Sequence, residues 1–143
     1  ISIIMTTHIL KLCVGAKTID DLVDWQTHLM KTYDRVFHTT RMVPKRDAEI
    51  LDDGSIYWVI ANQIVVRQKI LDIEVFTDRL EKRRCHLILD PELVHTRNKP
   101  QRPFQGWRYL LPDAAPADLS AGAEAELEMP EEMRQELAAL GLI

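Results

Sequence analysis

Beyond residue 55 the spacing of hydrophobic residues changes to that of β-strands, and this change limits the fold more than any other feature. Residues 56–60 form a continuous apolar and aromatic run, and residues 64–76 form a longer run rich in β-branched side chains. A strand pattern returns over residues 83–89. Short polar turns separate the three runs, so the sequence predicts an antiparallel meander.

A helix precedes these strands. Thr18 and Asp21 match the capping box that begins many helices, and apolar residues then recur at helical spacing as far as Tyr33. The sequence therefore predicts an amphipathic helix over residues 19–33, preceded by a strand over residues 7–14. Together these elements predict an α+β fold with a small antiparallel sheet or a partly open β-barrel.

The composition of the chain changes near Leu111. Residues 5–111 are predicted to form a single α+β core domain, which is long enough to bury a hydrophobic core. Residues 112–143 carry one basic and eight acidic side chains, whereas residues 31–110 carry fifteen basic and eleven acidic ones. We expect residues 112–143 to be an acidic linker that ends in a short helix over residues 130–141.

The two cysteines indicate the redox state of the compartment in which the protein is expected. Cys13 and Cys85 lie within apolar runs and do not form a disulfide framework, which favours a reducing cytoplasm. No apolar run approaches the roughly 20 residues of a membrane-spanning helix, so no membrane association is expected. The sequence also lacks metal-ligand spacings and nucleotide-binding glycine motifs, so neither a metal nor a cofactor is expected.

Residues 95–109 form a basic and aromatic segment. The segment has four lysine or arginine residues, three aromatic rings, two prolines and no carboxylate. Such a surface can hold a phosphate or stack a flat ring. The candidate residues here are Arg97, Arg102 and Arg108 for phosphates and Trp107 for stacking. Alternatively, the rings fill the core and the arginines are solvated, since strand alternation puts Trp107 and Arg108 on opposite faces.

A second basic segment, residues 35–46, also has four positive charges and no acidic residue. Its candidate anion-binding residues are His38, Thr39, Arg41, Lys45 and Arg46. A phosphate would lie on exposed amides where Pro44 begins a short helix. Alternatively, the threonine and histidine side chains satisfy local backbone groups. The nucleic-acid interpretation gains if the two basic segments are adjacent in the fold.

Two other features leave alternatives open. Arg67 and Lys69 share one face of the long predicted strand, which indicates either a functional face or an edge guarded by charge. His38 is the candidate acid–base group if the protein is a small-molecule enzyme acting on a phosphorylated or carboxylated substrate. No recognisable catalytic motif supports that alternative, and enzymatic activity is left open.

Several stretches of the chain resemble one bacterial family. They are residues 7–15, 38–42, 54–60, 89–94 and 102–110. The string Arg-Pro-Phe-Gln-Gly-Trp-Arg-Tyr that begins at Arg102 is fairly specific. On these stretches the chain resembles, over residues 6–120, the domain-of-unknown-function family 1489, found mostly in alphaproteobacteria. The resemblance implies a cytoplasmic bacterial protein and transfers no activity.

The order of strands is also similar to that of the PUA-like barrels, which include the ASCH and EVE domains. That similarity implies a basic and aromatic groove that reads RNA or a modified base. The leading prediction is therefore a non-catalytic module that binds RNA or a nucleotide-like anion. The alternative is an interaction or scaffold protein. In that case the helix over residues 130–141 contacts a partner or a second copy, or the acidic tail covers the chain's own basic groove.

Overall fold

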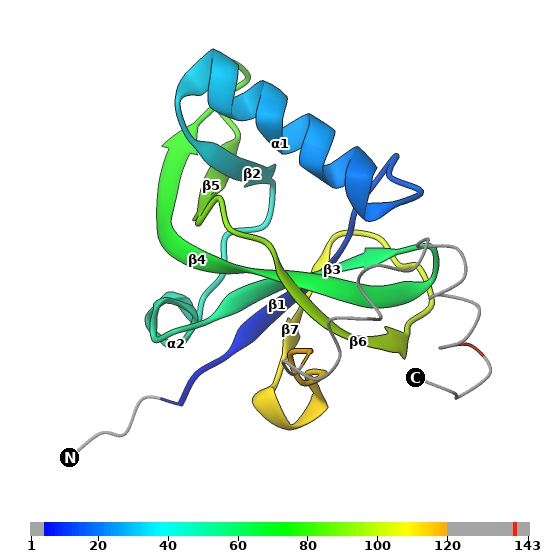
Figure 1. Ribbon diagram of the computed structural model, residues 1–143. Helices are drawn as coiled ribbons and strands as arrows, with labels where there is room; N and C mark the ends of the chain where they lie inside the picture. The colour runs from blue at the N-terminus through cyan, green and yellow to red at the C-terminus, as the bar shows by residue number, and fades with distance from the viewer. Residues whose placement is uncertain (1–4, 120–138, 140–143) are drawn as a thin grey trace.

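Seven β-strands form one mixed sheet at the centre of the described part of the chain. The computed structural model describes residues 5–119 and 139. The strands are β1 (His8–Leu12), β2 (Val36–Thr40), β3 (Ser55–Ile60), β4 (Gln63–Thr77), β5 (Arg83–Leu89), β6 (Val94–Pro100) and β7 (Trp107–Leu110). Their order is β2-β5-β4-β3-β1-β7, with β6 paired to β4, so the sheet is open (Figure 1).

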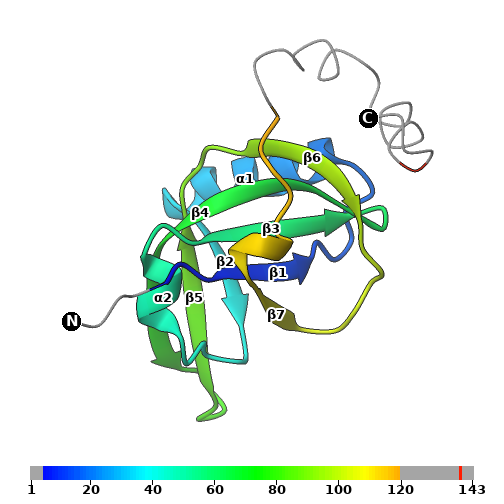
Figure 2. The ribbon, with the colours of Figure 1, turned by 90° about the horizontal axis from the view of Figure 1, so that it is seen from below.

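The longest strand, β4, connects the two parts of this sheet. Its first half pairs with β3 and β6, and its second half pairs with β5. The register with β5 shifts between Ile70 and Asp72. Such irregularities bend a strand and increase its twist. As a result β2 and β5 run across the direction of β1 and β3 (Figure 2).

Helix α1, Ile19–Tyr33, covers one side of the sheet (Figure 1). Its predicted bounds are confirmed, and so is the capping box. The Asp21 amide donates to the Thr18 hydroxyl at 3.3 Å, and the Thr18 amide donates to the Asp21 carboxylate at 3.2 Å. The buried side chains of the helix are Ile19, Leu22, Gln26 and Leu29. Burying this apolar stripe against the sheet stabilises both layers.

Hydrophobic residues fill both faces of the sheet around β1 and β3. One cluster includes Ile9, Trp58, Val66, Leu87 and Trp107. The other consists of Leu10, Tyr57, Val59, Ile64 and Leu110, with partly buried hydrophobic side chains packed against it. Neighbouring residues of a strand point to opposite faces, which is why adjacent positions fall in different clusters. All six residues of β3 are buried, as expected for a strand covered on both faces.

Helix α2, Asp47–Leu51, leads into a close backbone contact at Gly54. The Gly54 amide donates to the Ile50 carbonyl at 2.8 Å. A Cβ atom at residue 54 would overlap the carbonyl oxygens of Ile50 and Thr7. Glycine is therefore required where β3 begins beside β1. Pro44, expected to open this helix, lies before it as a buried residue of the preceding loop.

The predicted α+β class is confirmed, with differences in strand pairing. β1 and β3 run parallel, whereas the other five pairings are antiparallel, so the sheet is mixed. Strands β2 and β6 lie in the two segments that the sequence analysis treated as basic loops. The helix expected over residues 130–141 falls outside the described residues, apart from Ala139. The division into residues 5–111 and 112–143 stays a prediction.

Candidate functional site

A pocket of about 260 Å³ lies where the end of β1 meets α1, β2 and β3. Its lining residues are Leu12, Cys13, Val14, Trp25, His38 and Trp58, and we call it the aromatic pocket. Small-molecule sites begin at roughly 300 Å³, so this pocket has room for a single flat ring rather than a larger ligand.

The three rings of the aromatic pocket pack edge to face. The centroids of His38 and Trp58 are 5.4 Å apart, and Trp25 lies 6.4 Å from each of the other two rings. Trp58 is buried, and its indole Nε1 donates to Gln68 Oε1 at 2.9 Å, which fixes the ring. Trp25 is 38% exposed and therefore offers indole surface to a ligand.

His38 contributes a polar group to this apolar pocket. It shares the inward face of β2 with the buried Val36. Burial, with a smaller effect of Lys11, lowers the pKa of His38 to about 4, so its imidazole is neutral at pH 7. Its Nε2 atom is buried, and no described residue forms a hydrogen bond with it. An unpaired buried nitrogen is costly, and a bound ligand would satisfy it.

Lys11 places a positive charge beside the same pocket. In the sheet it is paired with Trp58 of β3 and Trp107 of β7. Burial lowers the pKa of Lys11, while the nearby Cys13 opposes this shift. Burial also raises the pKa of the Cys13 thiol to about 11, so Cys13 is not a thiolate partner for the lysine at neutral pH. None of the ion pairs formed within the described residues includes Lys11.

The two basic segments meet at β7. The Tyr109 hydroxyl accepts hydrogen bonds from the amides of Lys45 (2.9 Å) and Arg46 (3.2 Å). The Trp107 indole donates to the Met42 carbonyl at 2.9 Å. The Arg46 guanidinium lies over the Tyr109 ring at 5.2 Å. The amides that the sequence analysis assigned to a phosphate are therefore bonded to a tyrosine of the other segment.

The predicted site residues near β2 and β7 do not all face one ligand. Thr39 points away from His38, and its hydroxyl lies 2.9 Å from His86 Nδ1. Trp107 is 6% exposed and belongs to the core, so the stacking role expected for it does not fit its burial. Arg108 is exposed, and its guanidinium lies 4.3 Å from the centroid of the Phe104 ring.

The other predicted arginines lie at separate places on the surface. Arg41 is exposed in the loop that follows β2. Arg97 is exposed on β6, where its amide donates to the Ala117 carbonyl at 2.8 Å. Arg102 lines a different hollow, together with Asn62. Of the nine predicted residues, only His38 lines the aromatic pocket.

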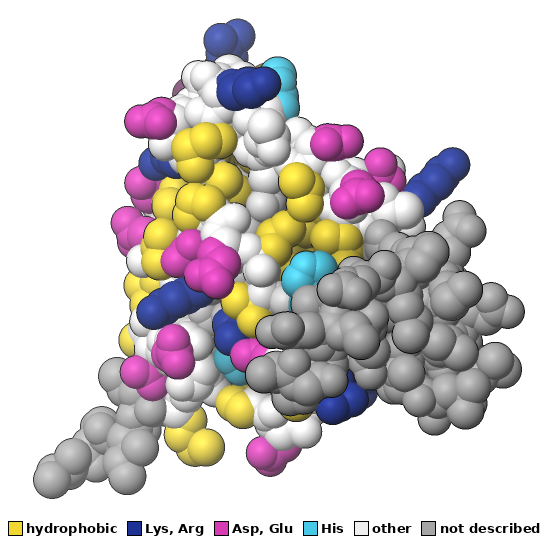
Figure 3. Space-filling view, viewed as in Figure 1, with side chains coloured by type: hydrophobic (Ala, Val, Ile, Leu, Met, Phe, Trp, Pro, Cys, Tyr) yellow, Lys and Arg dark blue, Asp and Glu magenta, His cyan; other side chains and the backbone are white. Residues whose placement is uncertain are grey.

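A second, wider groove of about 500 Å³ runs along α1. Its lining residues are Val23, Gln26, Thr27, Met30, Lys31, Val36, Pro91 and Leu93. Hydrophobic side chains gather below α1 on the face shown in Figure 3. Lys31 is the one charged residue of its described lining. The groove is therefore better suited to an apolar surface than to an anion.

Three residues of the aromatic pocket and its rim, Trp25, Trp58 and Lys11, are not among the predicted site residues. Trp25 belongs to the apolar stripe that predicts the helix over residues 19–33, and Trp58 belongs to the continuous apolar and aromatic run over residues 56–60. Lys11 stands between Leu10 and Leu12 in a mostly apolar strand. A lone lysine in such a strand is the signal that could have indicated a site.

The fold and the pocket define an α+β protein with an open mixed sheet and an aromatic pocket at one end of β1. The chain belongs to the DUF1489 family of proteins of unknown function, whose sequence profile matches residues 9–143. This match confirms the resemblance seen in the sequence. No curated protein and no solved structure matches the chain.

Residues 5–119 and 139 contain neither a membrane-spanning helix nor a metal-binding cluster. Neither helix found there is long and apolar enough to cross a membrane. Nor do three or more histidine, cysteine, aspartate or glutamate side chains come together there in a group that could hold a metal ion.

Proposed function

We propose that this protein binds a nucleotide-like anion, of which RNA is the polymeric form, with a base in the aromatic pocket. The observation that carries the proposal is the arrangement of Trp25, His38 and Trp58 around one hollow beside the positively charged Lys11. An apolar ring would pack against the aromatic side chains, and a negative charge would pair with Lys11. A nucleotide combines the two.

The base would pack against the exposed surface of Trp25. Stacking of a base on an aromatic side chain contributes roughly 1–3 kcal/mol and tolerates any base, because every base has a π-face. The neutral His38 imidazole adds one hydrogen-bonding nitrogen that no described residue uses. That nitrogen would give the pocket a polar contact with the edge of the ring.

The phosphate would be held by Lys11. Its ammonium is half-buried and lacks an ion pair with any residue of the described chain. Arg41 follows His38 by three residues, roughly 10 Å along an extended chain, which is within reach of the phosphate of a neighbouring nucleotide. Contacts of this kind make binding weaken steeply as salt rises.

The enzyme hypothesis receives less support from the same pocket. It requires His38 to act as an acid–base group near pH 7, usually beside a carboxylate that orients it. The lining of the aromatic pocket contains no aspartate or glutamate among the described residues, and the pKa of His38 is lowered to about 4. A binding role fits a neutral histidine in an apolar pocket better.

The scaffold hypothesis has one observation in its favour, the apolar groove along α1. A protein partner, a second copy or the predicted helix over residues 130–141 would fit such a groove. The similarity to PUA-like barrels and a bacterial cytoplasmic location likewise stay predictions. Neither of them is needed for the nucleotide proposal.

The test is calorimetric titration of the full chain with adenosine monophosphate and with short single-stranded RNA at low salt. We compare Trp25→Ala with Tyr33→Ala, a matched control. Tyr33 is an exposed ring on the same helix that packs on Phe37 instead of lining the pocket. We expect Trp25→Ala to raise the Kd about ten-fold, within the range of one lost stacking contact, and Tyr33→Ala to leave it unchanged. Absence of saturable binding, or binding that Trp25→Ala leaves intact, contradicts the proposal.

A further inference from the structure

A second hollow, of about 340 Å³, lies at the other end of β1. We call it the polar hollow. Its lining residues are His8, Asp53, Ser55, Tyr57, Arg67, Pro112, Ala115, Pro116, Ala117 and Asp118. His8 is the first residue of β1, whereas Cys13 of the aromatic pocket follows the last one. The two sites are therefore separate.

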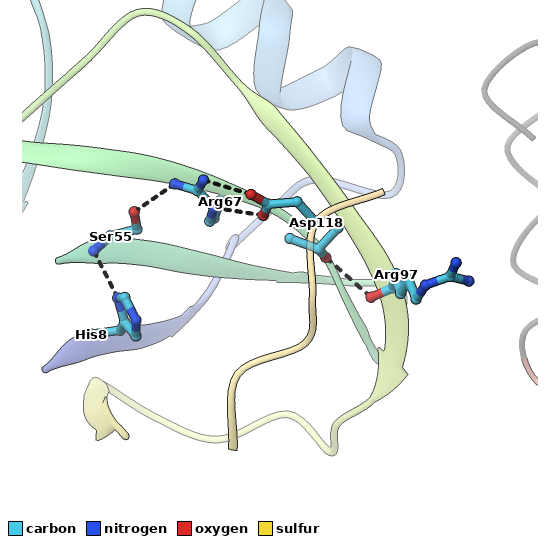
Figure 4. Close-up of polar contacts among 6 residues, drawn as sticks. His8, Ser55, Arg67, Arg97 and Asp118 are labelled. Carbon is cyan, nitrogen blue, oxygen red and sulfur yellow. Dashed lines mark hydrogen bonds and ion pairs between the residues drawn. The ribbon is translucent and has the colours of Figure 1, made fainter. Parts of the chain in front are cut away.

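Arg67 is the fixed positive charge of the polar hollow. It lies in the part of β4 that is flanked by β3 and β6, with Tyr57 and Val94 as its sheet partners. Its Nη1 donates to the Ser55 hydroxyl at 3.0 Å (Figure 4). Because this stretch of β4 is paired on both sides, it is not an exposed sheet edge. Arg67 therefore does not serve to protect an edge from pairing with another strand, which was one of the two roles considered from the sequence.

Three further donors of the hollow have no acceptor in the described chain, namely His8 Nε2 and the hydroxyls of Tyr57 and Ser55. The Ser55 amide donates to His8 Nδ1 at 3.0 Å, so the neutral imidazole carries its proton on Nε2 (Figure 4). Burial, followed by the Arg67 charge, lowers the pKa of His8 and favours this neutral form. Neither His8 Nε2 nor the Tyr57 hydroxyl forms a hydrogen bond with a described residue. The Ser55 hydroxyl accepts from Arg67 and keeps its own proton free to donate.

The chain supplies an anion to this hollow from its own acidic tail. Arg67 Nε and Nη2 donate to the two carboxylate oxygens of Asp118 at 2.7 and 2.8 Å (Figure 4). This is the bidentate geometry that arginine uses for carboxylates and phosphates. Asp53, the other carboxylate of the lining, is exposed and lies 3.5 Å from the Lys69 ammonium.

A short backbone pairing with β6 holds Asp118 beside Arg67. The Arg97 amide donates to the Ala117 carbonyl at 2.8 Å, and the Leu119 amide donates to the His95 carbonyl at 3.0 Å. Asp118 thus lies opposite Thr96 in an isolated antiparallel bridge beside β6. Two backbone hydrogen bonds and one partly exposed ion pair are a weak attachment. A competing anion could displace it.

We propose that the polar hollow is a binding site for an oxyanion of a ligand, a phosphate group or a carboxylate, and that Asp118 occupies its arginine until the ligand displaces it. The guanidinium of Arg67 and the hydrogen-bond donors of His8, Ser55 and Tyr57 form the site. This site does not depend on the nucleotide proposed for the aromatic pocket.

The experiment titrates the ¹⁵N-labelled full chain with inorganic phosphate and, separately, with acetate. Binding is followed at the Arg67 Nε–H and Ser55 amide signals in NMR spectra. Replacing the internal anion in Asp118→Asn should lower the Kd at least five-fold relative to the original chain. Asp113→Asn removes the same charge from the same tail without touching the hollow, and it should leave the Kd unchanged.

Two variants test the donors in the Asp118→Asn background. Arg67→Gln should abolish binding, and Tyr57→Phe, which removes only a hydroxyl, should raise the Kd several-fold while leaving the fold intact. The tighter of the two anions identifies the ligand group. No saturable shift with either anion in Asp118→Asn overturns the proposal, and so does an equal gain in Asp113→Asn. Binding of uncharged adenosine should not change in Asp118→Asn, which separates this site from the aromatic pocket.

Discussion

Gln26 of α1 and Gln68 of β4 exchange two amide hydrogen bonds, one in each direction. The distances are 2.5 Å from Gln26 Nε2 to Gln68 Oε1 and 2.8 Å from Gln68 Nε2 to Gln26 Oε1. Gln68 also accepts from Trp58 Nε1 and donates to the Asp90 carbonyl. Both glutamines are buried, so the network fixes α1 and Trp58 relative to the sheet and thereby shapes the aromatic pocket.

Replacing Gln68 should therefore destabilise the whole protein. Gln68→Leu leaves the Gln26 amide and the Trp58 indole without partners, and each unsatisfied buried group costs roughly 1–3 kcal/mol. We expect the free energy of unfolding to fall by about 3 kcal/mol in urea titrations. The matched control is Gln105→Leu at an exposed loop position, with an expected change below about 0.5 kcal/mol. Equal losses in the two variants would contradict the role of the network.

Gly54→Ala should be among the most destabilising small substitutions in the chain. The added methyl group overlaps the carbonyl oxygens of Ile50 and Thr7, and these are backbone atoms that cannot turn aside. Overpacking of this kind costs about 3 kcal/mol. Gly106→Ala is the control, because its φ of 72° is strained for alanine but no atom lies within 4 Å. It should cost only about 1 kcal/mol. Thermal unfolding of the two variants should show the larger loss of stability in Gly54→Ala. A larger loss in Gly106→Ala would mean that backbone strain costs more than steric overlap.

His38 should make the protein less stable below neutral pH. Burial holds its folded-state pKa at about 4, whereas the unfolded chain has the ordinary value of 6.5. Between these values the unfolded state binds more protons, so stability falls as the pH drops from about 6.5 towards 4. His38 alone should remove about 2 kcal/mol between pH 7 and pH 5.

A variant is needed to isolate the effect of His38, because burial also lowers the pKa values of His8 and His86. These two histidines therefore also make the protein less stable as the pH falls. Urea unfolding of the original chain and of His38→Gln at both pH values isolates the contribution of His38. The pH-dependent loss should be about 2 kcal/mol smaller in the variant. An unchanged pH dependence would show that His38 is not buried in the neutral form.

Lys11 should distinguish a nucleotide from its nucleoside. Lys11→Met keeps the apolar stem of the side chain and removes the charge, so binding of adenosine monophosphate should weaken about five-fold, equivalent to about 1 kcal/mol. Binding of adenosine should not change. Lys31→Met removes a charge from the apolar groove instead and serves as the control. Calorimetry that shows equal losses for the nucleotide and the nucleoside would place the phosphate elsewhere.

The local elements of the fold were predictable because their signals are local. The capping box at Thr18 and the apolar stripe behind it fix the ends of α1, and β-branched runs fix β3 and β4. Strands β2 and β6 were missed because their sequences, VFHTT and VHTRNKP, are short or polar. They become strands by pairing with β5 and β4, and no pattern within a segment reports such distant partners.

The site was harder to predict than the fold for a related reason. Two-residue alternation over residues 7–14 puts His8, Leu10, Leu12 and Val14 on one face, but Val14 is 79% exposed, while Ile9 and Cys13 of the opposite face are buried. Hydrophobic clusters cover both faces of β1, with Ile9 in one and Leu10 in the other, so Lys11 is half-buried rather than on a solvent-exposed face. The aromatic pocket depends on that parallel pairing with β3, which the predicted meander did not include.

Strand β4 pairs with more strands than any other strand in the described part of the sheet. β3, β5 and β6 all pair with this one strand, so β4 links the part of the sheet that contains β1 and β7 to the part that contains β2. Opening its first half would unpair β3 and β6, and opening its second half would unpair β5. The aromatic pocket and the polar hollow lie at opposite ends of β1, and residues of β1 and β3 line both of them. A ligand that holds these two strands folded at either site therefore also protects the other site from unfolding.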